Sequence, residues 1–186
     1  MASIKPVVPA LLVTAAFSEN LSLINWGMEQ MMRYLGPIAL ESEPFDFNQT
    51  SYYSKEMGPQ LFKKLFAFAD LVDPSKLADI KNMTNEIEST SHSTSLSEQP
   101  RPLNLDPGLL NLGKFMLATT KDQAHRIYLK DGIFAEVTLH FQDKEFVEWP
   151  WTYADYRTEH VKAFLKKARS FYKDKLKSLP PVEEYP

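Results

Sequence analysis

In the first half of the chain, some segments have the apolar pattern of a strand and others have apolar residues spaced three or four apart, as in a helix. The pattern therefore predicts strands and helices that follow one another. Residues 7–16 are apolar on both sides of an extended chain, as expected of a central strand. In residues 21–35 the apolar side chains recur at spacings of three and four, which predicts an amphipathic helix that ends at Gly36-Pro37. Residues 38–41 alternate again and predict a short second strand.

Strong capping signals separate the next two elements. Residues 61–72 predict a strand because Phe66 and Phe68 alternate with alanines, and a helix over the same window is the alternative. Asp73 and Pro74 then predict the start of a helix, with Asp as the cap and Pro in the first turn. The buried stripe of this helix is expected to consist of Leu77, Ile80, Thr84 and Ile87.

Turn-forming residues dominate the middle of the chain. We interpret residues 89–100, which are rich in Ser and Thr, as a mobile loop. Residues 104–113, NLDPGLLNLG, contain Asp-Pro-Gly and are interpreted as a turn-rich connector. Residues 114–120 then predict a strand.

A β-hairpin and a helix are expected to complete the fold. Residues 125–129 and 133–141 flank a Lys-Asp-Gly turn and predict the hairpin. Residues 155–178 predict a basic C-terminal helix with an apolar inner face, followed by a tail at residues 179–186. The order of elements predicts a single α+β domain over residues 1–186, in which a hairpin extends the mixed or antiparallel sheet of a ferredoxin-like βαββαβ unit.

Composition and charge exclude several classes of functional site and partner. The chain has no cysteine, which excludes disulfides, thiolate catalysis and iron–sulfur clusters. Its formal net charge of −3 argues against bulk binding of nucleic acid. Residues 157–177 nevertheless hold eight Lys and Arg against one Glu and one Asp. This stretch is either a solvated helix face or a surface for an acidic partner or a nucleic-acid backbone.

No segment is expected to enter a membrane. The longest apolar run, residues 7–17, is too short to span a bilayer as a helix and lacks the flanks of a signal peptide. We therefore expect a cytoplasmic protein. The glycine-rich phosphate loop and the dinucleotide-binding fingerprint are both missing from the sequence, which argues against P-loop hydrolysis and hydride transfer.

Residues 45–58, FDFNQTSYYSKEMG, mix aromatic and polar side chains. The stretch is too aromatic for a solvated linker and too polar for a core element, so it predicts either a binding loop or an irregular part of the scaffold. As a binding loop it would place Tyr52 and Tyr53 at a pocket. Its carboxylates Asp46 and Glu56, with Asp106, are candidate Mg²⁺ ligands, although their spacing does not demand a metal.

The hairpin brings a second group of polar residues together. Pairing its strands symmetrically about Asp131 places Arg126 opposite Glu136, with Thr138 further along the same face. The pair is either an anion-binding platform or a structural salt bridge on a half-exposed sheet.

The opposite face of the hairpin, which carries Ile127 and Leu129, is expected to face the core. His125 falls on this apolar face or at its rim. Lys121 lies just before the hairpin, at a strand-to-loop transition of the kind where ligand-binding groups collect.

Four motifs together resemble one bacterial family. FDFNQTSYYSKEMG, RPLNLDPGLLNLGKFMLATTKDQAHRIYL, GIFAEVTLHF and WTYADYRT are long motifs spread over the chain. They are similar to the family catalogued as domain of unknown function 4416, with departures at Leu109, at Ala154 and in the longer Ser/Thr-rich loop. The resemblance implies a site and no named reaction. Some members carry a GTP-binding label, for which this sequence has no phosphate loop.

Three hypotheses for the function follow. In the first, the protein binds or acts on a small anionic molecule, such as a phosphorylated metabolite or nucleotide. Lys121 and Arg126 would hold the anion, and Glu136 would orient Arg126 or act as general base, with His125 as an alternative acid or base. In the second, a non-enzymatic module docks an acidic protein or nucleic acid through the basic helix. In the third, the polar motifs only stabilise the fold.

Overall fold

The structure, a computed structural model, describes residues 6–47 and 54–179. The strands are β1 (Ala10–Ser18), β2 (Ile38–Glu41), β3 (Phe45–Asp46), β4 (Phe62–Val72), β5 (Asn104–Leu110), β6 (Lys114–Thr119), β7 (Ile127–Lys130), β8 (Ile133–Gln142) and β9 (Glu145–Glu148). The α-helices are α1 (Leu21–Leu35), α2 (Ser54–Met57), α3 (Leu77–Thr90) and α4 (Glu159–Lys177). The short 3₁₀ helices are η1 (Pro74–Lys76), η2 (Ser91–Ser93) and η3 (Ala154–Arg157).

One antiparallel sheet organises these elements. Its strand order is β2-β4-β1-β5-β6-β8-β7, with β3 also paired to β4 and β9 to β8. β1 lies inside the sheet and all nine of its residues are buried, which confirms the central strand predicted from the apolar run. The α+β class and the C-terminal helix are confirmed as well.

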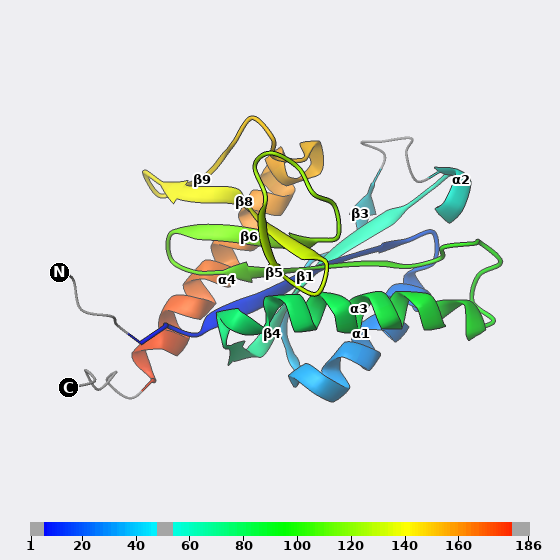
Figure 1. Cartoon of the computed structure of the whole chain (residues 1–186), viewed down its shortest axis with the longest axis horizontal. Helices are drawn as coiled ribbons and strands as arrows, with labels where there is room; N and C mark the ends of the chain where they lie inside the picture. Colours follow the sequence, from blue (N-terminus) through cyan, green and yellow to red (C-terminus); the bar gives the residue numbers. More distant parts are fainter. Residues whose placement is uncertain (1–5, 48–53, 180–186) are drawn as a thin grey trace.

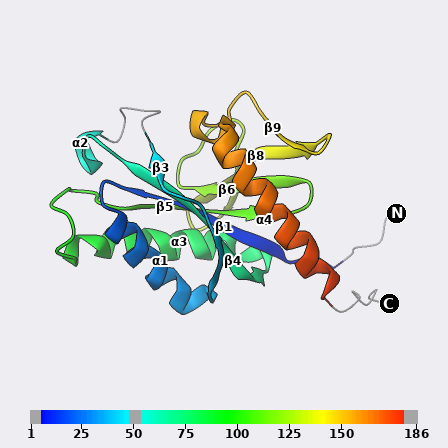
Figure 2. The ribbon, with the colours of Figure 1, turned by 180° about the vertical axis from the view of Figure 1, so that it is seen from behind.

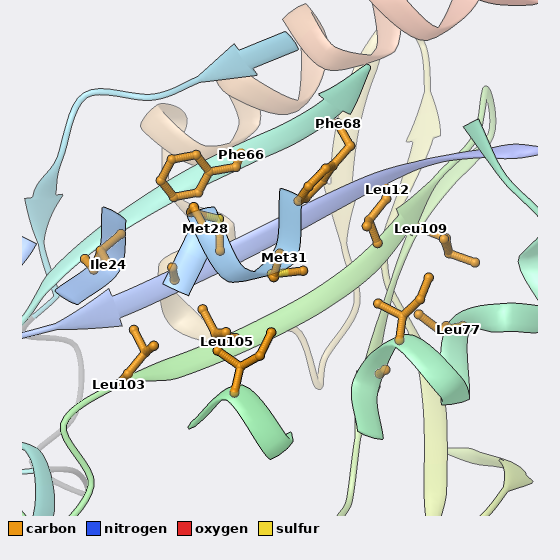
Figure 3. Close-up of a cluster of buried hydrophobic side chains, with 14 of the residues drawn as sticks. Leu12, Ile24, Met28, Met31, Phe66, Phe68, Leu77, Leu103, Leu105 and Leu109 are labelled. Atoms are coloured by element: carbon orange, nitrogen blue, oxygen red, sulfur yellow. The ribbon is translucent and has the colours of Figure 1, made fainter. Parts of the chain in front are cut away.

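Helices cover the two faces of the sheet separately (Figures 1 and 2). On one face, α1 and α3 pack on a cluster that includes Leu12 of β1. Met28 and Met31 of α1 and Leu77 of α3 contribute to this cluster (Figure 3). On the other face, α4 packs on a cluster that includes Leu11 of β1. Because successive residues of β1 enter different clusters, both of its faces are apolar.

The helices begin and end close to the residues that the sequence signals indicate. Asn20 caps α1 by accepting a hydrogen bond at 2.8 Å from the N–H two residues further on. Gly36 ends α1 with φ of 80°, a conformation that glycine tolerates. Asp73 caps η1 in the same way as Asn20 caps α1. At the C-terminus η3 comes first and Thr158 caps α4, so the long helix begins later than predicted.

The prediction of a connector at residues 104–113 is wrong, because Asn104–Leu110 form strand β5 between β1 and β6. Asp-Pro-Gly is a common turn sequence, yet here the glycine serves close packing. A Cβ on Gly108 would collide with the carbonyl oxygen of Met116 and come 2.7 Å from the Phe115 ring. The strand expected to follow the second helix is therefore β5, and the predicted strand at residues 114–120 is the next one, β6.

Pro107 explains where β5 and β6 part. The N–H of Asn111 donates to the carbonyl oxygen of Lys114 at 3.0 Å. In an antiparallel sheet, the N–H groups of successive residues point alternately to the strands on the two sides. Asn111 bonds to β6, so the backbone nitrogen of Pro107, four residues earlier, also faces β6. Proline has no N–H to donate. The register between β5 and β6 accordingly ends at the pair Gly108–Leu117.

The hairpin is present, but its exposed face differs from the prediction. Ile127 pairs with Ala135 as predicted, and a register shift within β7 then brings Lys130 opposite Ile133. Ile127 is 73% exposed and Leu129 is 39% exposed. The predicted core face is therefore wrong for β7, all four residues of which are exposed.

The segment predicted as a mobile loop, residues 89–100, begins as helix. α3 runs to Thr90, and η2 follows it directly. Further along, Ser97 donates to Glu19 at 3.0 Å, which ties the segment to the start of α1. Its mobility stays a prediction, as does a single domain over the whole chain. The predicted tail lies outside the described residues from position 180 onward. None of the described helices is long and apolar enough to cross a membrane.

Candidate functional site

A cavity of about 620 Å³ lies where β5 and β6 part. Its lining includes α3 residues from one side of the sheet and η3 residues from the other. The strands between these layers also contribute, among them β4, β5, β6 and β8. The end of the β5–β6 ladder at Pro107 therefore leaves space that both layers reach.

Lys63 of β4 is a buried cation at the η3 side of the cavity. Its side chain is 2% exposed, and its Nζ lies 2.5 Å from Oδ2 of Asp155 in η3. The ammonium also lies between 4.6 and 5.5 Å from the ring centroids of Tyr156, Phe47 and Phe17. Aromatic faces attract cations electrostatically. The carboxylate and the rings together surround the buried amino group.

The sheet register places an amide beside this lysine. Phe17 of β1 pairs with Lys63 on one side and with Asn104 of β5 on the other. Residues that pair directly in an antiparallel sheet point to the same face. Lys63, Phe17 and Asn104 therefore form a row across three strands, and all three line the cavity.

A second charged cluster lines the α3 side. Lys81 donates to the carbonyl oxygen of Leu105 at 2.7 Å and lies 3.5 Å from carboxylate oxygens of Glu88 and Asp106. Glu88 accepts from the N–H of Leu105 at 2.8 Å and lies 3.7 Å from Arg101. Burial raises the pKa of the Glu88 carboxyl above its usual value, against the opposing effect of Lys81.

Two buried polar groups of the lining have no hydrogen-bond partner within the described part of the chain, Nδ2 of Asn104 and the hydroxyl of Tyr156. Each residue is 2% exposed. Nδ2 is a donor only, and Oδ1 of Asn104 accepts from Arg101. Burial raises the pKa of Tyr156 well above its usual value, so its hydroxyl stays protonated and can donate. Buried donors without acceptors cost free energy; acceptor atoms of a ligand would satisfy both.

Glu136 of β8 is the centre of a bonded group in the cavity wall. Its Oε2 accepts from Nε of Arg126 at 2.8 Å, with both side chains 1% exposed, and lies 3.1 Å from Nε2 of His125. The remaining guanidinium nitrogens donate to the carbonyl oxygen of Lys121 at 2.9 Å and to the hydroxyl of Tyr153 at 2.6 Å. The predicted cross-strand ion pair is present, and it is buried rather than half-exposed.

An aromatic stack orients His125. Its ring lies 5.1 Å from that of Trp151 with an interplanar angle of 14°, and Trp151 stacks on Trp149 at 5.3 Å and 7°. Stacking fixes the plane of the imidazole, and Glu136 fixes one of its nitrogens. His125 therefore turns toward the polar group of the wall; because β7 begins at Ile127, it lies at the rim, the second of the two predicted positions, and not on the apolar face.

The structure brings together most of the predicted ligand-binding and catalytic residues. Lys121 and Glu136 line the cavity. Arg126 and His125 both contact Glu136, so they lie directly behind a residue of the cavity lining. Thr138 is fully buried, with its Oγ1 3.5 Å from Oε1 of Glu136.

The other predicted site residues are not brought into this group. Asp46 in β3 and Glu56 in α2 are exposed, whereas Asp106 lines the cavity and pairs with a lysine. Residues 6–47 and 54–179 contain no group of three or more His, Asp or Glu that could hold a metal ion. Tyr52 and Tyr53 lie outside the described residues. Magnesium binding thus stays a prediction without support from these positions.

Several residues of the site were not predicted. Lys63, Lys81 and Glu88 lie in strand and helix patterns where a charged residue normally marks the solvent side. Nothing local distinguishes them from such surface residues. Asp155 and Tyr156 fall within the WTYADYRT motif, and that motif is the signal that could have found them.

The basic residues of α4 include several that contact other elements. Lys162 pairs with Glu148 of β9 at 2.7 Å, and Lys166 pairs with Glu145 of the same strand. Arg169 lies 3.6 Å from the ring centroid of Phe141. The two ion pairs balance part of the positive charge that the sequence concentrates in this helix.

The fold and the site together define an α+β protein with one antiparallel sheet and a polar cavity between two of its strands. The chain belongs to the family described as Domain of unknown function (DUF4416), which matches residues 8–172. This match confirms the resemblance carried by the four motifs. No curated protein and no solved structure matches the chain.

Proposed function

We propose that this protein binds a small anionic molecule, such as a phosphorylated metabolite or a nucleotide, in the cavity between β5 and β6. The observation that carries the proposal is a pair of buried donors, on Asn104 and Tyr156, for which residues 6–47 and 54–179 provide no acceptor. Phosphate or carboxylate oxygens would accept from both. Lys63 lies beside the Tyr156 ring and Arg101 contacts Asn104, so a cation accompanies each donor.

The size and walls of the cavity suit such a ligand. A volume of about 620 Å³ lies within the range of roughly 300–1,000 Å³ that is typical of small-molecule sites. Phe17, Phe47 and Leu117 offer apolar contact to the uncharged part of a ligand. The polar groups on the two sides would then fix its orientation.

Glu136 is the carboxylate that supports an enzymatic role. It lines the cavity and is held by Arg126 and His125 through its Oε2. In an enzyme Glu136 would act as general base toward the ligand, with His125 as the neighbouring acid or base. In a binding protein the same contacts would orient Arg126 toward the anion.

Thermal unfolding in the presence of nucleotides and phosphorylated metabolites tests the proposal. A ligand at 100 times its dissociation constant adds about 2.7 kcal/mol to the free energy of unfolding, which raises the melting temperature by several degrees. Tyr156→Phe should greatly reduce this shift, because it removes the donor and keeps the ring beside Lys63.

Thr14→Val is the matched control. The hydroxyl of Thr14 is also buried without a partner in the described residues, but Thr14 does not line the cavity. Each substitution removes one unsatisfied hydroxyl and should preserve or raise the stability of the ligand-free protein, by up to about 1 kcal/mol. Loss of the ligand shift in Tyr156→Phe alone supports the site. No shift with any compound, or equal shifts in the two variants, would contradict it.

The basic helix is the weaker alternative as a docking surface. Lys162 and Lys166 already pair with carboxylates of β9, which lowers the charge available to an acidic partner. A chain without cysteine fits a reducing compartment, so a cytoplasmic location remains part of the proposal.

We also infer that the first part of the fold is a ferredoxin-like unit. The chain order β1-α1-β2-β4-α3-β5, the strand order β2-β4-β1-β5 and the packing of α1 and α3 on one face support this inference. On this interpretation the cavity lies at the junction between that unit and the added strands β6 to β9.

A further inference from the structure

The charged cluster on the α3 side of the cavity has as many basic side chains as carboxylates. Lys81 lies 3.5 Å from both Glu88 and Asp106, and Arg101 lies 3.7 Å from Glu88. Two cations therefore face two carboxylates. An anion that enters the cavity adds negative charge beside these carboxylates, and like charges repel. Uptake of one proton by the cluster would offset that charge.

Glu88 is the carboxyl group best placed to take up this proton. Its side chain faces Lys81 from its own helix, Asp106 and the N–H of Leu105 from β5, and Arg101 from the segment before β5. Burial already raises its pKa, and the negative charge of Asp106 acts in the same direction. A further anion close by would raise it more, because like charges disfavour ionisation of a carboxyl group.

Arg101 connects Glu88 to one of the unsatisfied donors. The same guanidinium nitrogen that contacts Oδ1 of Asn104 lies 3.7 Å from Oε2 of Glu88. The amide and the carboxyl group are thus neighbours on the cavity wall. Asn104 shares its sheet face with Lys63, and Arg101 links its amide to the Glu88 carboxyl group, so a ligand oxygen that accepts from Nδ2 of Asn104 would lie near both.

We propose that anion binding is coupled to the uptake of one proton by Glu88, which then donates a hydrogen bond to the ligand oxygen that Asn104 also binds. This inference rests on the proposed function. The proton moves from the solvent to a carboxylate oxygen of Glu88, and no other covalent bond forms or breaks. Glu88 is then a residue of ligand recognition that works only when protonated, so affinity falls as the pH rises.

Isothermal titration calorimetry of the full chain tests this coupling, with adenosine 5′-monophosphate and inorganic phosphate as the probes. Titration at one pH in two buffers of different ionisation enthalpy gives the number of protons taken up on binding. The wild type should take up close to one proton more per ligand than Glu88→Gln. The ligand's own proton exchange is the same in both proteins and cancels in this difference.

Glu88→Gln should retain binding, because the amide is a permanent donor in place of the protonated carboxyl group. At pH values where Glu88 is ionised in the free protein, wild-type affinity should fall about tenfold per pH unit relative to the variant. Glu86→Gln is the matched control, since Glu86 is an exposed residue of the same helix outside the cavity lining. It should behave as the wild type does.

The outcomes separate this inference from the proposed function. Binding of a probe with equal proton uptake in the wild type and Glu88→Gln overturns the coupling and leaves the binding site intact. Loss of proton uptake in Glu86→Gln as well would also overturn it, because the effect would then not belong to the cavity. Failure of both probes to bind counts against the proposed function and the coupling together.

Discussion

Replacing Lys63 with methionine tests whether the buried ion pair at the cavity organises the site. Methionine keeps most of the apolar stem of lysine and removes the ammonium. Asp155, whose side chain is 7% exposed, then loses the cation that lies 2.5 Å from it. The rings of Tyr156, Phe47 and Phe17 lose the same cation. The variant therefore leaves a buried carboxylate without its counter-charge.

The expected loss is large. Breaking a buried pair by removing one partner costs about 3–5 kcal/mol, because the other charge stays buried. For a chain of 186 residues, 1 kcal/mol corresponds to roughly 2–4 °C in melting temperature, so Lys63→Met should melt roughly 6–20 °C lower. The double variant Lys63→Met/Asp155→Leu removes both charges and should lie within about 1 kcal/mol of the wild type.

Urea unfolding of the wild type, both single variants and the double variant measures the coupling energy of the pair, expected to be at least about 2 kcal/mol. Lys64→Met is the control, since Lys64 pairs with Glu41, whose side chain is 60% exposed. An exposed pair of this kind contributes about 0–1 kcal/mol. A loss of less than about 1 kcal/mol in Lys63→Met, or a double variant as unstable as the sum of the singles, would refute the reasoning.

Three further predictions concern the frame of the site. Gly108→Ala should lower the free energy of unfolding in urea by about 1–3 kcal/mol, because its Cβ collides with the Met116 carbonyl; Gly113→Ala, with nothing nearer than 3.8 Å, should have little effect. Asn20→Ala should cost about 1 kcal/mol by thermal unfolding, because α1 loses its cap. The pKa of Glu88 is raised in the folded protein above its ordinary value of 4.5. The ligand-free wild type should therefore lose stability relative to Glu88→Gln as the pH rises from about 4.5 through the folded pKa. A difference in melting temperature that stays constant across that range would contradict the shift.

Periodicity in the sequence was sufficient for the elements that bury a continuous face. β1 and α1 were predicted because their apolar residues follow a single period over many positions. β5 was missed because Asp106-Pro107-Gly108 favours a turn locally, whereas pairing with β1 and burial between two helical layers hold it as a strand. The exposure of Ile127 was missed for a related reason. A period of two separates the faces of a strand and does not say which neighbour covers each face.

The contacts of the candidate site also differ in whether a local pattern predicts them. The contact between Arg126 and Glu136 could be predicted because hairpin pairing relates residues that are close in the chain. Lys63 and Asp155 are separated by 92 positions, and their contact depends on how η3 folds back over β4. No local pattern encodes such a contact.

Under the proposed function, the unsatisfied groups of the cavity lining belong to a binding site rather than to a purely structural network. A network that served only the fold would satisfy its own donors, since nearly all buried polar groups in native proteins are hydrogen-bonded. Instead, Asn104 and Tyr156, two residues of the cavity lining, each carry a buried donor that no described residue accepts from. Pro107 ends the ladder beside them and keeps the strands apart, where a residue with an N–H could have continued the sheet. Unsatisfied donors and an interrupted ladder both lower stability in the ligand-free protein, and both would be offset by an acceptor-rich ligand between the strands.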